Sequence, residues 1–216
     1  MVITYLGKDF VRINSGERAL ALSPAASDGG RRIGSFGADI ALAPVRDKDH
    51  AAFDHVTHGK TEPFTIYGPG EYEVGGISII GVASDRVCSL DDRERVNTAY
   101  VIGLEGIRLC HMGAHRKADF PAGVSEALGA VDVLFISIGG EAGLDHAGAQ
   151  KIVATLEPKM IIPLRASGEN GEKEFKAFLK ESGEGNAPAA GKLVLKKKDL
   201  EGKDGEVVVL ECAVEG

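Results

Sequence analysis

The sequence contains no tryptophan and only three cysteines, Cys88, Cys110 and Cys212, among its 216 residues. Three is an odd number, and no two of them have the close spacing of metal ligands. We therefore expect neither a disulfide framework nor a zinc knuckle. Such sparse use of cysteine is typical of a reducing compartment, and it predicts a cytoplasmic protein.

Long apolar runs are also missing. No stretch approaches the roughly 18 apolar residues that a membrane helix needs, and the start of the chain lacks the basic and apolar regions of a signal peptide. The formal net charge is -7, which excludes a general attraction to nucleic acid or to an anionic membrane. With 44% hydrophobic and 26% charged residues, the composition is that of a globular protein. We expect one domain over residues 1–216.

Short runs of β-branched and apolar residues dominate the first half of the chain. Glycine-containing turns separate these runs, a pattern typical of strands. The predicted strands are 2–7, 9–14, 18–23, 38–43, 64–68, 72–76 and 77–83, followed by a hairpin over 97–113.

Helical patterns appear in the second half. Residues 120–129, 145–157 and 171–182 are predicted helices, the second with Asp145 as its N-cap. Between them, 131–140 and 159–166 are almost continuously apolar, which is typical of strands covered on both faces. A final hairpin is expected over 192–214. Together these elements predict an α/β protein in which a β meander gives way to β-α units.

Several segments occur in an informative order. They are "ITYLG", "GADIALA" leading to "DH", "GGISIIGVA", "NTAYVIGLEGIRLCHMG", "VDVLFISIGG" and "EPKMIIPL". This order resembles the metallo-β-lactamase fold superfamily, and most of all its small, single-domain Zn-dependent hydrolases. The resemblance covers nearly the whole chain. It implies a four-layer αβ/βα sandwich with an active site at one edge of the sheets.

In that family a loop with the pattern H-x-H-x-D-H supplies ligands for two metal ions, which lower the pKa of a bound water. The corresponding loop here reads "VRDKDH". Val45 and Asp47 stand at the two histidine positions, whereas Asp49 and His50 match the pattern.

Four further positions depart from the family pattern. Lys8 follows "LG" where a histidine is usual, and Arg86 is aligned with the histidine after "GISIIGV". "CHMGA" places Ala114 at the bridging acid, and "IPLR" places Arg165 at the last histidine. Two ligands do not make a stable zinc site, so the resemblance supports the fold more than the activity.

Three interpretations follow. The first is a hydrolase-like binding protein, weakly catalytic or not catalytic, that has lost its dinuclear centre and needs no cofactor. The second is a residual hydrolase of an ester, amide, lactone or phosphodiester. It would use one weakly bound zinc or other divalent metal on Asp49 and His50, with His115 or Asp47 as a further donor. In the third, Lys8, Arg86 and Arg165 bind a phosphorylated or carboxylated small molecule.

Structural interpretations compete with these. Asp49 has the residue type of a helix N-cap for a helix near His50, which is the reading we favour over a weak metal site. His115 is expected to be a polar loop residue and His111 a structural one. Since buried carboxylates need a cation, we expect Arg165 to pair with Asp49 or Asp47 in place of the metal.

Overall fold

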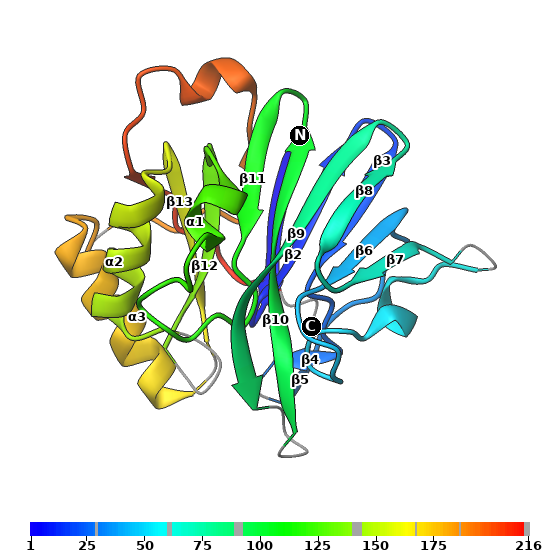
Figure 1. The fold of residues 1–216 in the computed structure, drawn as a ribbon, viewed down its shortest axis with the longest axis horizontal. Helices are drawn as coiled ribbons and strands as arrows, with labels where there is room; N and C mark the ends of the chain where they lie inside the picture. The colour runs from blue at the N-terminus through cyan, green and yellow to red at the C-terminus, as the bar shows by residue number, and fades with distance from the viewer. Residues whose placement is uncertain are drawn as a thin grey trace.

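Two β-sheets packed face to face form the centre of the molecule (Figure 1). The computed structural model describes residues 1–28, 30–59, 62–88, 93–139, 144–166, 168–185 and 187–213, with the backbone alone for residues 31 and 88. This sandwich confirms the fold class expected from the order of the sequence segments.

The first sheet is built mostly from the N-terminal part of the chain. Its strand order is β14 (Leu193–Val194), β1 (Val2–Gly7), β2 (Phe10–Ser15), β3 (Arg18–Leu22), β6 (Ile40–Ala43) and β7 (Phe64–Tyr67). β1, β2 and β3 are antiparallel neighbours, whereas β3, β6 and β7 run parallel. The short strands β4 (Ser27–Asp28) and β5 (Arg31–Arg32) pair apart from it.

The second sheet contains the longest strands. Its order is β15 (Glu206–Val207), β13 (Met160–Arg165), β12 (Val133–Ile138), β11 (Ile107–His111), β10 (Glu94–Leu104), β9 (Ile77–Cys88) and β8 (Gly70–Val74). β8 to β11 are antiparallel, and β11, β12, β13 and β15 run parallel. The carboxyl ends of β6, β11, β12 and β13 lie toward the same end of the sandwich.

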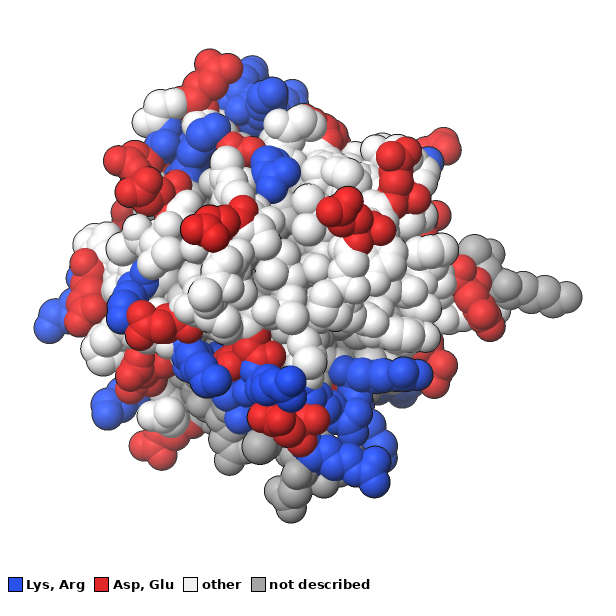
Figure 2. Space-filling model, viewed as in Figure 1, with Lys and Arg blue, Asp and Glu red and all other residues white. Residues whose placement is uncertain are grey.

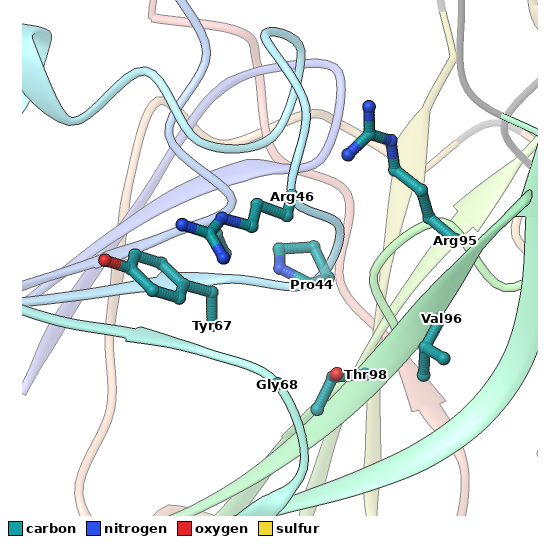
Figure 3. Close-up of a pocket in the computed structure, with 8 residues that line it drawn as sticks. Pro44, Arg46, Tyr67, Gly68, Arg95, Val96 and Thr98 are labelled. Atoms are coloured by element: carbon teal, nitrogen blue, oxygen red, sulfur yellow. The ribbon is translucent and has the colours of Figure 1, made fainter. Parts of the chain in front are cut away.

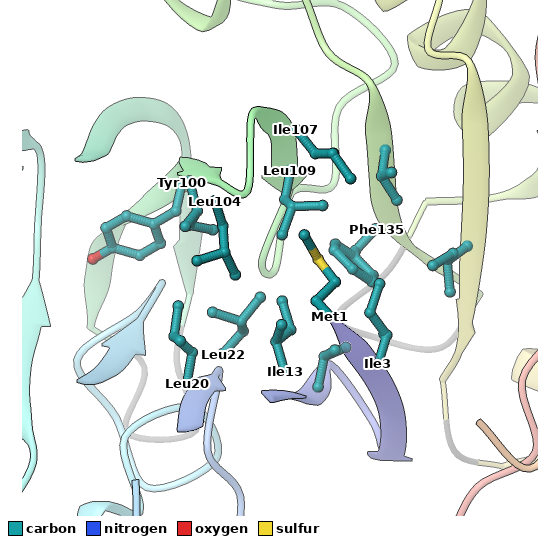
Figure 4. Packing of buried hydrophobic residues seen from close by; sticks show 14 of the residues in the cluster. Met1, Ile3, Ile13, Leu20, Leu22, Tyr100, Leu104, Ile107, Leu109 and Phe135 are labelled. Carbon is teal, nitrogen blue, oxygen red and sulfur yellow. The ribbon is translucent and has the colours of Figure 1, made fainter. Parts of the chain in front are cut away.

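Apolar side chains from both sheets meet in the main core (Figure 4). Strand β12 shows why its sequence is continuously apolar. Val133 and Phe135 face the other sheet, whereas Leu134 and Ile136 pack under the helices. A strand covered on both faces, as predicted for this segment, is thereby confirmed.

The α-helices of the described residues cover the outer face of the second sheet. They are α1 (Val124–Leu128), α2 (His146–Leu156) and α3 (Glu169–Glu181). The Asp145 side chain accepts a hydrogen bond from Gly148 N at 2.7 Å, which confirms the predicted N-cap of α2. Outside the first sheet, Val56 of the 3-10 helix η1 (Phe53–Val56) packs with Ala25, Ile33 and Ala38.

Two expectations about strands are wrong. The C-terminal segment is not a hairpin, because β14 pairs with β1 of the first sheet and β15 with β13 of the second. Between them lies the 3-10 helix η2 (Lys197–Leu200). Strand β9 does not stop at residue 83 but continues to Cys88, paired along β10. Arg86 therefore lies on a strand and not in a ligand-presenting loop.

Charge is unevenly spread over the surface. Figure 2 shows Lys and Arg side chains gathered along the lower edge of the view, below a broad face with few charges. In Figure 1 the β9–β10 hairpin reaches toward this edge. None of the helices in the described part of the chain has the length and apolarity needed to cross a membrane.

Candidate functional site

The loop that follows β6 is shaped by Asp47. Its Oδ1 accepts hydrogen bonds from Asp49 N and His50 N, both at 3.0 Å, and lies 2.7 Å from His50 Nδ1. An aspartate that binds the backbone just ahead of it holds a tight turn. The helix-capping role expected for Asp49 is therefore wrong. The first helix after this loop begins at Phe53 and has no side-chain cap.

His50 is enclosed by two carboxylates. Its Nε2 lies 3.3 Å from Asp9 Oδ2, while its Nδ1 faces Asp47. Burial alone would lower the pKa of His50, but the hydrogen bonds to Asp47 and Asp9 raise it to about 9. Burial likewise opposes ionisation of Asp47, yet its hydrogen bond with His50 brings the pKa of that carboxyl below its usual value. At neutral pH the centre of the site is an imidazolium between two carboxylates.

The side chain of Asp9, which the sequence patterns did not single out, joins three segments. It lies in the β1–β2 turn and is 4% exposed. One carboxylate oxygen accepts a hydrogen bond from the Ser137 hydroxyl of β12, and the other faces His50. In the sequence, a role for Asp9 is indicated only by its position directly after "LGK", at the end of a strand that leads to the site.

His111 is a structural residue, as expected. Its Nδ1 accepts a hydrogen bond from Gly113 N at 3.1 Å, so the ring proton is on Nε2. Nε2 donates to the backbone oxygen of Asp9 at 2.7 Å. Burial lowers the pKa of His111, and the neutral ring ties the end of β11 to the β1–β2 turn.

The three cations named from the sequence are paired with three different acids. Lys8 Nζ lies 2.7 Å from Asp49 Oδ1. Arg86 binds the exposed Glu94 at 3.0 Å, and Arg165 binds Glu172 at 2.8 Å. Each of these contacts reflects where the backbone directs the side chain.

The expected pairing of Arg165 with Asp49 or Asp47 is therefore wrong. Among the described residues, Lys8 and His50 are the cations that meet those two acids. The arginine side chain is 48% exposed and points to α3 instead of the site.

Asp85, the residue before Arg86, is a buried acid in this part of β9. Its side chain is fully buried and accepts hydrogen bonds from the backbone N–H groups of Arg86 and Arg116 at 2.7 and 3.0 Å. Burial opposes ionisation, but these bonds and Lys117 Nζ, 3.2 Å away, lower the pKa of Asp85.

His115 is buried beside Asp85. Its Nδ1 lies 3.9 Å from Asp85 Oδ2, and the ring packs against Phe120 with centroids 5.2 Å apart. Neither ring nitrogen has a hydrogen-bond partner among the described residues. Burial lowers the pKa of His115. The expected polar loop residue is in fact part of the interior.

An apolar cluster stands where the family pattern places two metal ligands. Val45 and Ala114, each 1% exposed, pack with Val87, which is 3% exposed. Asn97 fixes this arrangement, because its Oδ1 accepts a hydrogen bond from Ala114 N at 2.9 Å. The sequence indicated the loss of ligands at 45 and 114, but not that Val87 fills the space between them.

These residues do not fit a dinuclear metal centre. Val45 and Ala114 offer no side-chain donor, and both nitrogens of His50 are already engaged by carboxylates. No group of three or more His, Cys, Asp or Glu side chains in the described ranges is arranged to hold a metal ion. A catalytic zinc normally has three protein ligands.

Comparisons with known proteins agree with this fold. A family model described as "Beta-lactamase superfamily domain" matches residues 2–165. A Thermotoga maritima protein assigned to the Zn-dependent hydrolases of the metallo-β-lactamase superfamily is similar in structure, with a TM-score of 0.73 and 25% identity, covering 97% of this chain and 98% of that one.

More distant structures share the fold alone. A metallo hydrolase from Ignicoccus hospitalis has a TM-score of 0.65 at 16% identity, covering 97% of this chain and 94% of its own. An isothiocyanate hydrolase from Delia radicum gut bacteria has a TM-score of 0.63 at 11% identity, covering 91% and 100%. Among curated proteins no match was found.

Proposed function

The chain belongs to the beta-lactamase superfamily, and we propose that within it this hydrolase-like protein binds a ligand without a catalytic metal centre. Ion pairs and an apolar cluster take the place of the two metal ions. The proposed ligand is a small molecule or anion, the proposed compartment is the cytoplasm, and no cofactor is required.

The apolar cluster of Val45, Val87 and Ala114 is the observation that carries this proposal. A metal ion binds only where several donors converge on it. Here the two positions that would flank the ion are occupied by hydrocarbon side chains in contact with a third. Inserting a divalent ion among them would require desolvating it without compensation, which is very unfavourable.

Charge compensation supports the same conclusion. In a metal centre the cation neutralises the buried carboxylates. Here the His50 imidazolium lies between Asp9 and Asp47, and Lys8 pairs with Asp49. Both ring nitrogens of His50 face these carboxylates, so neither nitrogen is free to donate to a metal. Hydrolysis through a metal-activated water is therefore not expected of this site.

The alternative is a residual hydrolase with one weakly held divalent metal on Asp49 and His50. It requires His50 to lose its proton and one carboxylate partner, and Asp49 to separate from Lys8. Metal analysis of the full chain, purified without a histidine tag from zinc-supplemented cells, distinguishes the two. We expect far less than one metal ion per chain, and near-stoichiometric zinc, manganese or iron would overturn the proposal.

Two variants identify the origin of any metal found. His50→Gln removes the candidate ligand, whereas His58→Gln removes an exposed histidine outside the site. Metal lost in the first variant and retained in the second supports the hydrolase. Metal lost only in the second is surface binding and leaves the binding-protein proposal in place.

A further inference from the structure

A groove of about 720 Å³ is lined by residues of both sheets. The β2–β3 turn and the β8–β9 turn contribute to it, near the labels β3 and β8 in Figure 1. Asp39 also lines the groove and directly precedes β6, whereas the loop of the altered metal centre follows that strand. The groove therefore lies at the opposite end of the sandwich. It is larger than the pocket of about 260 Å³ beside Arg46 and Tyr67 (Figure 3), and its volume is typical of small-molecule sites.

Side chains of both charges line this groove without pairing with one another. Arg18 and Glu17 are exposed and form no hydrogen bond or ion pair within the part of the chain that the structure describes. Asp39 is also exposed, and its Oδ2 accepts a hydrogen bond from Ala19 N at 2.7 Å. Its Oδ1 has no partner among the same residues. The groove thus presents one cation and two carboxylates that a ligand can reach.

The guanidinium of Arg18 packs against the backbone of Gly75. A Cβ at that position would lie 2.6 Å from Arg18 Cζ, closer than side chains come to one another. Gly75 also has a φ of +58°, and glycine is the residue that permits both features. The arginine of the first sheet is thereby held against a turn of the second, while its charge stays unpaired.

Hydrogen bonds fix the backbone and one side chain at the edge of the groove. Asp39 N donates to Ala19 O, and Asp39 O accepts from Phe64 N, both at 2.8 Å. The Ser15 hydroxyl, which also lines the groove, donates to Glu105 Oε1 at 2.6 Å. The walls are therefore in place before any ligand arrives, which lowers the entropic cost of binding.

The floor of the groove is apolar. Ile77 and Leu104 line it, and both belong to the main core between the sheets. They are 3% and 7% exposed. A ligand with an apolar group can cover the surface that these two residues still expose to water, which favours binding.

From these observations we propose that the groove binds a small zwitterion, a dipeptide with an apolar side chain. Its carboxylate pairs with Arg18, because a guanidinium matches the two oxygens of a carboxylate. Its ammonium group pairs with Asp39 and Glu17, and its side chain contacts Ile77 and Leu104.

The length of the ligand follows from the separation of these charges. Arg18 does not touch either acid, so the two ends of the ligand must be apart as well. The ammonium and carboxylate of a single amino acid are attached to the same carbon, whereas a further residue adds roughly 3.5 Å. The inference goes beyond the proposed function, since it concerns the end of the sandwich away from the altered metal centre.

NMR titration of the isotope-labelled full chain tests this assignment. The probes are alanyl-leucine and leucyl-leucine, and N-acetyl-leucyl-leucine amide is the control that carries neither charge. We expect saturable binding of at least one free dipeptide, with perturbed amides at Ala19, Gly75, Gly76 and Ile77. The blocked control should bind about tenfold more weakly, because two ion pairs are lost. Leucine alone should also bind more weakly, since it is too short to reach both charges.

Matched variants identify the groups that bind each end of the ligand. Arg18→Gln should weaken binding of the free dipeptide by roughly threefold to tenfold and bring it level with binding of the dipeptide amide. The double variant Glu17→Gln, Asp39→Asn keeps an oxygen that can accept from Ala19 N. It should remove the preference for a free over an acetylated amino terminus. Lys48→Gln, which removes an exposed cation at the other end of the molecule, should change affinity by less than about twofold.

Three results would overturn the inference: no saturable binding of either dipeptide, equal binding of the blocked control, or an affinity unchanged in both groove variants. Leucine that binds as tightly as the dipeptides would contradict the proposed length of the ligand. Metal analysis tests the proposed function separately, because the groove shares no lining residue with the loop of the altered metal centre.

Discussion

Replacing His50 should change how stability depends on pH. The pKa of His50 is raised to about 9, against about 6.5 for an unperturbed histidine. A difference of about 2.5 units corresponds to about 3.5 kcal/mol at roughly 1.4 kcal/mol per unit, of which about 3 kcal/mol remains at pH 6.5. This is a large part of the unfolding free energy of a typical domain, about 5–15 kcal/mol.

The direction of this pH dependence follows from the fact that the fold stabilises the protonated form of His50. Below pH 6.5 the histidine is charged in both states, and the folded protein has the full benefit of its carboxylate partners. Between pH 6.5 and about 9 the folded protein holds a proton that the unfolded chain does not, so stability falls as pH rises. The contribution of His50 is lost once the pH passes its folded-state pKa.

Urea unfolding of the native sequence and His50→Gln at pH 6.5, 7.5, 8.5 and 9.5 measures this effect. We expect the variant to be less stable by about 3 kcal/mol at pH 6.5, with the difference shrinking toward pH 9.5. His58→Gln, at an exposed histidine, serves as the control and should show a small, constant difference. A His50→Gln difference that does not vary with pH would refute the imidazolium assignment.

Three further predictions concern buried side chains near the site. Burial lowers the pKa of His115, so below pH 6.5 the unfolded chain takes up a proton before the folded protein does, and stability falls. His115→Phe should therefore reduce the drop in melting temperature between pH 7 and 5. A drop that is unchanged in the variant would contradict this prediction. Ala114→Asp restores the family's acid among apolar neighbours and should destabilise by about 3 kcal/mol or more in urea unfolding; rescue by added zinc would count against the apolar cluster. Cys110, whose pKa burial raises to about 12, should resist a thiol reagent until urea unfolds the protein, and labelling of the native thiol, read by peptide mass spectrometry, would show that it is accessible.

Local patterns in the sequence predicted much of the fold. The continuous apolar run of β12 indicated a strand buried on both faces, and Asp145 indicated the start of α2. The N-cap prediction depends on interactions within a few residues, and the strand prediction depends on the general rule that continuously apolar strands are covered on both faces. The hairpin predicted for the C-terminal segment was wrong because the pairing partners of β14 and β15 are distant in sequence. Local periodicity does not reveal such partners.

The candidate site was only partly predictable for the same reason. The family pattern identified Val45, Asp47 and Ala114 as departures, because it compares positions one by one. Pairing among the replacements depends on tertiary geometry: the partner of Asp49 is Lys8, not Arg165. The role of Asp9 becomes visible only when the β1–β2 turn meets His50 and Ser137.

The central claim is that this site holds no metal, and that the His50 ring is held between Asp9 and Asp47 instead of serving as a metal ligand. Nitrogen NMR of the His50 ring at pH 7, with and without one equivalent of zinc, tests it most directly. The account predicts a ring protonated on both nitrogens, with resonances unchanged by zinc. A neutral ring whose resonance shifts on adding zinc would contradict the account and restore the metal site.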